Sequence, residues 1–123
     1  MRHFVIGEFN CSHCGENRMD TAFLEQLDEL RHMYGKPLVV SSGYRCPAHN
    51  AAVSSTGLTG PHTTGRAADL LVDRGNAFAL LKLALALGFT GIGIKQHGAG
   101  RFLHVDNLPN APGQPRPALW SYP

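Results

Sequence analysis

The chain has 123 residues, a length that suits one domain over residues 1–123 with a single hydrophobic core. Hydrophobic residues make up 43% of the sequence and charged residues 16%, which excludes an intrinsically disordered chain. The net charge of +2, without any run of Lys or Arg, argues against nucleic acid as a partner.

The first half of the chain is predicted to hold one long helix between less regular segments. Asp20 has the side chain of a helix N-cap, apolar residues then recur at helical spacing, and Gly35 and Pro37 end the pattern. The predicted elements are an irregular segment 1–18 with an extended piece around Phe4 to Ile6, a helix capped by Asp20 and running through Tyr34, a short buried strand Leu38–Val40, a short helix Pro47–Val53 and a loop 54–65.

The second half is predicted to alternate strands with one helix. The helix is apolar on nearly every side, so we expect it to be buried. The elements are a strand Ala67–Val72, a helix Asn76–Leu87 closed by Gly88, strands Gly91–Lys95 and Arg101–Asp106 joined by a Gly-rich turn, and an extended tail after Leu108. The closely spaced last pair predicts an α+β fold with a small antiparallel sheet and flanking helices.

Three residues have side chains suited to binding a metal ion. His62 lies in the Gly/Pro-rich loop, Asp69 interrupts an apolar strand, and His104 lies between Leu103 and Val105. A carboxylate in such a strand is costly to bury unless it is paired or bound to metal. Two histidines and one carboxylate form a common catalytic zinc set, which leaves a fourth position open.

Each of these residues also has an ordinary structural interpretation. A lone histidine in a strand is more often a core residue than a ligand, and a lone aspartate is usually a cap or an ion-pair partner. The H-E-x-x-H motif is absent, which excludes a thermolysin-type site. Spacing alone therefore leaves the zinc site as one of several interpretations.

Three motifs in a fixed order resemble the M15-type D-alanyl-D-alanine carboxypeptidase family of zinc peptidases. They are Ser42-Gly43-Tyr44-Arg45, the segment Pro61–Asp69 and the segment Phe102–Asp106, and the resemblance extends from about Phe4 to Trp120. Short phage and bacterial members are the most similar in pattern. The resemblance implies the zinc peptidase fold that these enzymes share with the Hedgehog signalling domain. It also implies zinc on His62, Asp69 and His104, and peptidoglycan stem peptides as the substrate.

The same resemblance implies that Arg45 binds substrate. A guanidinium beside zinc suits a peptide carboxylate or a developing oxyanion, although a surface ion pair is the simpler alternative. Ser42 and Tyr44 belong to the same substrate-binding motif, and we expect them to shape the turn and the pocket rather than to react.

The chain departs from the family pattern at the positions of the general base. Many members carry an acidic residue or a histidine shortly before the last ligand, where this chain has Arg101 and Phe102. Asp106 shares a strand face with His104, so we expect it to be the catalytic base, with His97 of the adjoining turn as the next candidate. Asp106 could equally orient the imidazole of a ligand histidine.

The chain has three cysteines, and an odd number without a secretory signal argues against a disulfide framework. Cys11 and Cys14 form a single C-x-x-C pair, which is weak evidence for zinc. With Cys46, and with His13 or His49 as a fourth ligand, they could form a second, structural metal site. The alternative is that the thiols are reduced and pack as small hydrophobic groups.

The function implied by the resemblance is a zinc-dependent hydrolysis of bonds that involve D-amino acids, by a carboxypeptidase or an endopeptidase. The alternative is an inactive zinc-containing module that binds wall peptides, as the Hedgehog domain keeps this scaffold without known peptidase activity. The residues Arg101 and Phe102 favour the alternative, whereas the zinc set together with Arg45 favours the enzyme.

The sequence also sets expectations for location and partners. Residues 1–9 contain no apolar core of a secretory signal, and the apolar stretch Ala77–Leu87 is interrupted by Lys82 and too short to span a bilayer. We therefore expect a monomer made in the cytoplasm, without membrane insertion, that reaches the cell wall by a separate route. A phage or prophage endolysin, or a virion component, would fit.

Overall fold

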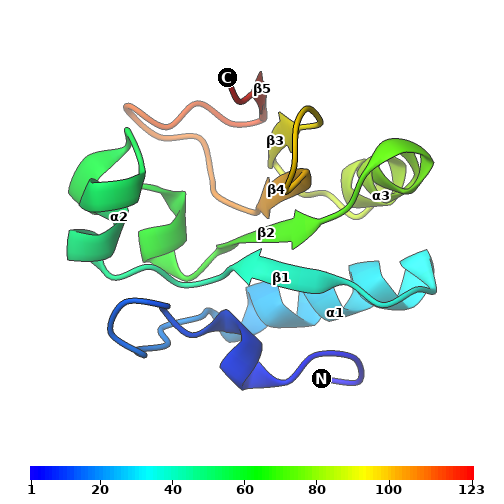
Figure 1. Ribbon diagram of the computed structural model, residues 1–123, viewed down its shortest axis with the longest axis horizontal. Coiled ribbons are helices and arrows are strands. Elements are labelled where there is room, and N and C mark those ends of the chain that lie inside the picture. The colour runs from blue at the N-terminus through cyan, green and yellow to red at the C-terminus, as the bar shows by residue number, and fades with distance from the viewer.

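One five-stranded mixed sheet organises the chain, with helices around it (Figure 1). The computed structural model describes residues 1–123. The elements in chain order are η1 (Ile6–Phe9), α1 (Thr21–Tyr34), β1 (Val39–Ser42), α2 (Pro47–Val53), η2 (Gly57–Thr59), η3 (Pro61–Thr64), β2 (Ala67–Leu71), α3 (Arg74–Ala86), β3 (Gly91–Lys95), β4 (Phe102–Asp106) and β5 (Ala118–Ser121), where η denotes a 3-10 helix.

The strand order is β1-β2-β4-β3-β5, and four of the five strands pair antiparallel. The α+β class is therefore confirmed. The C-terminal tail is extended at β5, as predicted, but it also pairs with the sheet, where β5 forms an edge strand parallel to β3 with Trp120 opposite Gly93. The sheet is consequently mixed rather than wholly antiparallel, and the tail is part of it.

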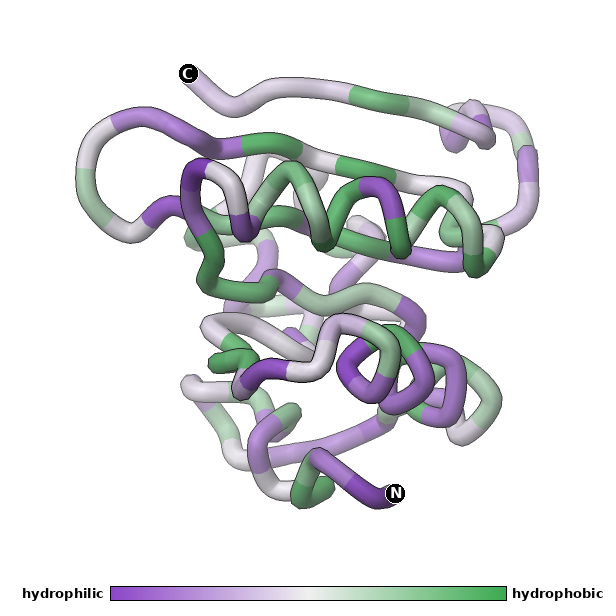
Figure 2. Tube along the Cα trace, turned by 90° about the vertical axis from the view of Figure 1, so that its right-hand side faces the viewer, coloured by the Kyte–Doolittle hydropathy of each residue, from purple (hydrophilic) through white to green (hydrophobic).

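The hydrophobic core lies on one face of this sheet, beneath α1 and α3. Residues alternate along β2 and β4, so that Leu70, Leu103 and Val105 enter the core while the residues between them face the other way. Phe23, Leu27 and Leu30 of α1 and Leu80 of α3 complete the layer. Figure 2 shows hydrophobic colouring along much of α3 and the strands, whereas much of α1 is coloured hydrophilic.

Capping and turn residues in the sequence predicted most ends of the helices and strands correctly. The Asp20 side chain accepts a hydrogen bond from the Phe23 N–H at 2.8 Å, and Gly35 ends α1 with a φ of 74°. The expected burial of the second long helix is wrong, since α3 exposes Phe78 and Leu85 to solvent and buries one face only. None of the helices has the length and continuous apolar character needed to cross a lipid bilayer.

Other element boundaries differ from the prediction. The strand expected at residues 38–40 is β1 at Val39–Ser42, and the loop 54–65 contains the two 3-10 turns η2 and η3. The extended piece expected around Phe4 to Ile6 is short, because Val5 has extended backbone with φ −97° and ψ 134° and η1 begins at Ile6.

The N-terminal segment is fastened to the rest of the fold at two places. The Asp28 carboxylate on α1 accepts hydrogen bonds from the backbone N–H groups of Arg2 and His3 at 3.1 and 2.9 Å. Burial alone would raise the pKa of Asp28, but these bonds and the Arg2 guanidinium outweigh it and hold the pKa below its ordinary value. At the second place, Tyr44 N–H donates to the Phe9 carbonyl at 2.9 Å, and Gly43 lies so close to Phe9 that a Cβ there would clash.

Candidate metal centre

The three predicted ligands come from two neighbouring strands and one turn. Asp69 of β2 and His104 of β4 are register partners, and both face away from the core. His62 lies in η3, the turn that leads into β2, and Gly65 ends that turn with a φ of 75°. All three residues are buried, at 4%, 5% and 1% exposure for His62, Asp69 and His104.

The donor atoms of these residues converge on one point. His62 Nε2 lies 3.2 Å from Asp69 Oδ1, His104 Nδ1 lies 3.1 Å from the same oxygen, and the two nitrogens are 3.3 Å apart. Ligands at zinc distances of about 2.0–2.2 Å in a tetrahedron lie about 3.3–3.6 Å from one another. The separations of 3.1–3.3 Å are at or just below that range, so small shifts of the side chains would suffice for a tetrahedral zinc site with one position left for water or substrate.

The second nitrogen of each histidine is also engaged, which fixes how the ring faces the centre. His62 Nδ1 donates to the Gly43 carbonyl at 2.8 Å, and His104 Nε2 donates to Asp106 Oδ2 at 2.7 Å. These partners leave the lone pairs of His62 Nε2 and His104 Nδ1 directed toward the point where the three donor atoms converge. The Gly43 carbonyl is thus part of the site, although its sequence motif suggested only a turn.

Asp106 is held in a buried ion pair on the same face of the sheet. Its carboxylate is fully buried, and Arg116 donates to Oδ1 through Nε and to Oδ2 through one terminal nitrogen, each at 2.9 Å. Gly91 on β3 lies opposite, and a Cβ there would collide with the Asp106 carboxylate. Sequence reasoning missed Arg116, because it lies in the Pro-rich tail and no local pattern marks it.

The charges in this cluster oppose the cost of burial. Burial alone would raise the pKa of Asp69, but His62 and His104 outweigh it and hold that pKa well below its ordinary value. Burial would lower the pKa of His104, whereas its hydrogen bonds with Asp106 and Asp69 raise it above the ordinary value. For Asp106, burial is outweighed by His104 and Arg116, which lower the pKa. Both carboxylates are therefore charged at neutral pH.

Arg45 lies beside the ligand carboxylate. One terminal nitrogen of its guanidinium is 3.5 Å from Asp69 Oδ2, the oxygen that faces away from the two histidines. Its Nε donates to Ser42 Oγ at 3.1 Å, and its other terminal nitrogen donates to Asn50 Oδ1 at 3.2 Å. Asn50 is fully buried and also donates to Thr56 Oγ1, a partnership that the sequence motif did not indicate.

A cavity of about 590 Å³ opens over these residues. Its wall on one side is formed by Trp120 and Tyr122, and a Cβ at Gly93 would clash with both rings. The Trp120 ring also contacts His104, with ring centroids 5.0 Å apart. The residues that line it are Arg45, Val53, Ser54, Ser55, Thr56, Pro61, His62, Asp69, Lys95, Phe102, His104, Trp120, Ser121, Tyr122 and Pro123. Asp69 carries the one side-chain carboxylate among them.

The remaining predicted residues lie around this cavity rather than in it. Tyr44 is buried and, with Ser42, borders a separate hollow of about 40 Å³, so both support the turn that carries Arg45. Asp106 does not line the cavity. His97 is exposed in the β3–β4 turn, and its Nε2 donates to the Tyr122 carbonyl at 3.2 Å.

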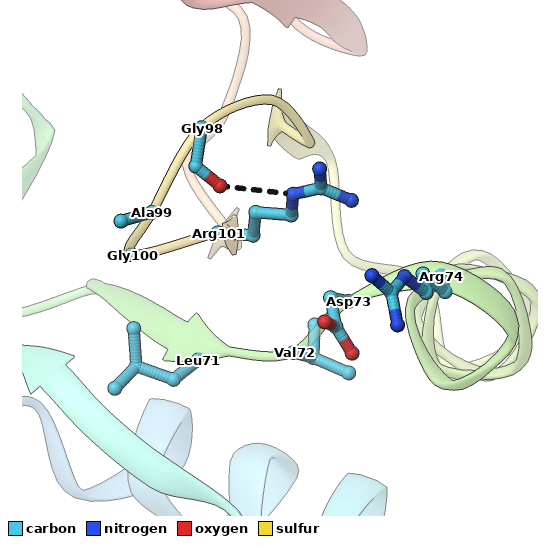
Figure 3. A pocket seen from close by; sticks show the side chains of 8 residues that line it. All are labelled: Leu71, Val72, Asp73, Arg74, Gly98, Ala99, Gly100 and Arg101. Carbon is cyan, nitrogen blue, oxygen red and sulfur yellow. Dashed lines mark hydrogen bonds between the residues drawn. The ribbon is translucent and has the colours of Figure 1, made fainter.

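A second cavity, of about 430 Å³, lies at the other end of β2 (Figure 3). Arg101 and Arg74 border it, and Arg101 Nε donates to the Gly98 carbonyl. Arg101, at one of the two positions where the resemblance led us to expect a proton acceptor, therefore borders a cavity that shares no lining residue with the cavity over the candidate metal centre.

Comparison with known protein families gives one match. The family model described as Peptidase M15 matches residues 2–106, which include all three converging ligands. No curated protein matches the chain.

Proposed function

The chain belongs to the peptidase M15 family, a family of metallopeptidases, and on that premise we propose that it is a zinc-dependent hydrolase of peptidoglycan stem peptides. The bond cleaved involves a D-amino acid, either at the end of the stem, as in a D-Ala-D-Ala carboxypeptidase, or within the stem or cross-link. A role as a phage or prophage lytic enzyme, or as a virion component, belongs to the same proposal.

The observation that carries this proposal is the convergence of His62 Nε2, Asp69 Oδ1 and His104 Nδ1 at the floor of an open cavity. Zinc held there would polarise the scissile carbonyl and activate water near neutral pH. A purely structural zinc site has four protein ligands and no open position, whereas this set offers three protein ligands next to a cavity of about 590 Å³.

Arg45 is the residue that we assign to substrate binding. Ser42 and Asn50 fix its guanidinium from two sides, and its charge remains at the wall of the cavity. A guanidinium oriented in this way can bind the carboxylate of a peptide or stabilise the oxyanion that develops as the carbonyl is attacked. Lys95 also borders the cavity, so the site is suited to a substrate with negative charge.

Asp106 is proposed as a positioning residue rather than as the base. Both of its oxygens accept hydrogen bonds, from His104 and Arg116, and it is fully buried away from the cavity. Of the two candidates from the sequence, His97 retains a ring nitrogen without a hydrogen-bond partner, and its ring contacts the Tyr122 backbone at the cavity wall. We therefore propose His97 as the proton acceptor.

The experiment is digestion of purified peptidoglycan, with mass spectrometry of the released peptides. We expect new termini at D-amino acid bonds, loss of activity with a chelator and recovery with added zinc. His104→Ala should be inactive, and Arg101→Ala, outside the cavity, should behave as wild type. Intact peptidoglycan after treatment with zinc-loaded protein would refute the proposed peptidase activity.

An inactive module that binds wall peptides is the second candidate, and one observation favours it. Among the side chains that line the cavity, none carries a carboxylate besides Asp69 or an imidazole besides His62 and His104, so no side-chain base other than the candidate ligands contacts the space for substrate. On this alternative, zinc-loaded protein would sediment with purified cell walls and release no peptide, and His97→Ala would change neither result.

A further inference from the structure

A second cluster of metal-binding side chains lies outside the cavity. Cys11 and Cys14 in the N-terminal segment and Cys46 at the N-cap of α2 are all free thiols, with their sulfur atoms within 4.8 Å of one another. Cys11 is buried, whereas Cys14 is exposed. Thiols that merely packed as small hydrophobic groups would not leave one of the three in solvent.

The turn that carries Cys11 and Cys14 is shaped for a metal ligand. Gly15, with a φ of 75°, donates its N–H to the Cys11 carbonyl at 2.8 Å and closes the turn. The backbone N–H groups of His13, Cys14 and Cys46 all direct hydrogen bonds to the Cys11 sulfur, the last at 3.4 Å. Converging N–H groups stabilise a thiolate, which is the form of cysteine that binds a metal ion.

Imidazole groups lie beside the thiols. His13 Nδ1 is 3.5 Å from Cys46 Sγ, and the His13 ring stacks on the ring of His49 with centroids 5.5 Å apart. In a tetrahedral zinc site with Zn–S of about 2.3 Å and Zn–N of about 2.0–2.1 Å, a sulfur and a nitrogen lie about 3.5–3.6 Å apart. His49 follows Cys46 on the first turn of α2, so each histidine is near enough to complete a four-ligand set.

We propose that Cys11, Cys14 and Cys46 bind a second, structural zinc ion, with His13 or His49 as the fourth ligand. Cys-rich sets with four protein ligands are typical of closed structural zinc sites.

The position of this site gives it a structural consequence. Cys46 directly follows Arg45, and the same turn contains Gly43, whose carbonyl accepts the His62 hydrogen bond. A metal ion there would join the N-terminal segment to the turn that places Arg45 and orients His62. It would do so independently of the hydrolytic centre, with no shared ligand.

The test measures metal content and the ligand atoms together, in protein purified under reducing conditions. We expect wild type to hold about two zinc ions per chain, with about one left in Cys14→Ser and about one left in Asp69→Ala. Cys14 is exposed, so its replacement leaves the core intact. Cobalt in place of zinc should give thiolate-to-metal charge-transfer absorption, retained in Asp69→Ala and lost in Cys14→Ser. Glu16→Gln, next to this turn, is the matched control and should keep both ions, because its exposed side chain pairs with Arg18 rather than with the thiols or imidazoles.

The two variants also separate this proposal from the proposed function. Loss of peptidase activity with the cobalt–thiolate absorption intact would concern the hydrolytic centre alone. A wild-type content of about one zinc ion that disappears in Asp69→Ala, with no thiolate absorption in any sample, would overturn the second site. Unchanged zinc content and unchanged cobalt spectra in both His13→Ala and His49→Ala would overturn the assignment of a histidine as the fourth ligand.

Discussion

Replacing Asp106 with asparagine tests the role that the structure favours for this residue. The carboxylate accepts the His104 Nε2 hydrogen bond at 2.7 Å and a two-pronged contact from Arg116 at 2.9 Å on each oxygen. Asparagine has the same shape but one acceptor oxygen and no charge. Whichever way the amide turns, its NH₂ group faces either the His104 ring N–H or the Arg116 guanidinium, and both of those groups are donors.

Two effects of different size follow. Arg116 is left nearly buried, with 7% of its side chain exposed and no anionic partner. Breaking a buried ion pair by removing one partner costs about 3–5 kcal/mol, and we expect the lower end because one hydrogen bond survives. A ligand histidine that loses its orienting carboxylate weakens metal binding by about 10–100-fold. That range corresponds to about 1.4–2.7 kcal/mol of binding free energy.

Three measurements separate positioning from catalysis. They are urea unfolding of the metal-free protein, zinc affinity by competition with a chromophoric chelator, and turnover of peptidoglycan fragments at saturating zinc. We expect lower stability and weaker zinc binding, with turnover of the zinc-loaded protein close to wild type. Asp73→Asn, which replaces an exposed aspartate at the start of α3, is the matched control. A fall in turnover of about 10²–10⁴-fold with unchanged zinc affinity would instead make Asp106 the general base.

Asp69→Ala should abolish activity and remove the part of the zinc-induced rise in melting temperature that comes from the His62–Asp69–His104 centre, because a ligand of that centre is lost. Full activity would show that this ligand set is wrong. Arg45→Lys should retain zinc and lower kcat/KM by about 10–100-fold, because lysine lacks the planar pair of N–H donors. Arg101→Lys is the control, and the same kcat/KM in both variants would show that Arg45 does not bind substrate. The lowered pKa of Asp28 stabilises the fold above its ordinary pKa of about 4, and this contribution is lost as the pH falls through the folded-state value. Asp28→Asn should therefore lower the free energy of unfolding in urea by about 1–3 kcal/mol at pH 7 and by progressively less toward pH 2. An equal loss at pH 7 and pH 2 would show that the charge of Asp28 does not stabilise the fold.

Features that depend on neighbouring residues could be predicted from the sequence. Asp20 and Gly35 mark the ends of α1 because capping involves atoms within one turn of the chain. The candidate ligand set could be predicted for another reason. His62, Asp69 and His104 interrupt loop and strand patterns where polar groups need an explanation, and the order of the surrounding motifs is specific to one family.

The partners of these residues could not be predicted, because they come from distant segments without a pattern of their own. The sequence around Asn50 predicts an ordinary helix residue, yet Asn50 is fully buried and accepts a hydrogen bond from the Arg45 guanidinium. Arg116 lies between prolines in a segment expected to be extended, yet it neutralises Asp106. Pairing of this kind depends on the return of the tail to the sheet, and β5 has only four residues to indicate it.

The two glycines of β3 connect this tail to the metal centre. Glycine weakens a strand unless another group needs the space, and both glycines here face occupied space. Gly91 leaves room for the Asp106 carboxylate, and Gly93 leaves room for the Trp120 and Tyr122 rings. Trp120 in turn contacts His104 and packs against the Arg116 guanidinium, 5.2 Å from its ring centre. The orientation of His104 is therefore determined from one side by β2 and from the other by a strand that the sequence pattern left unassigned.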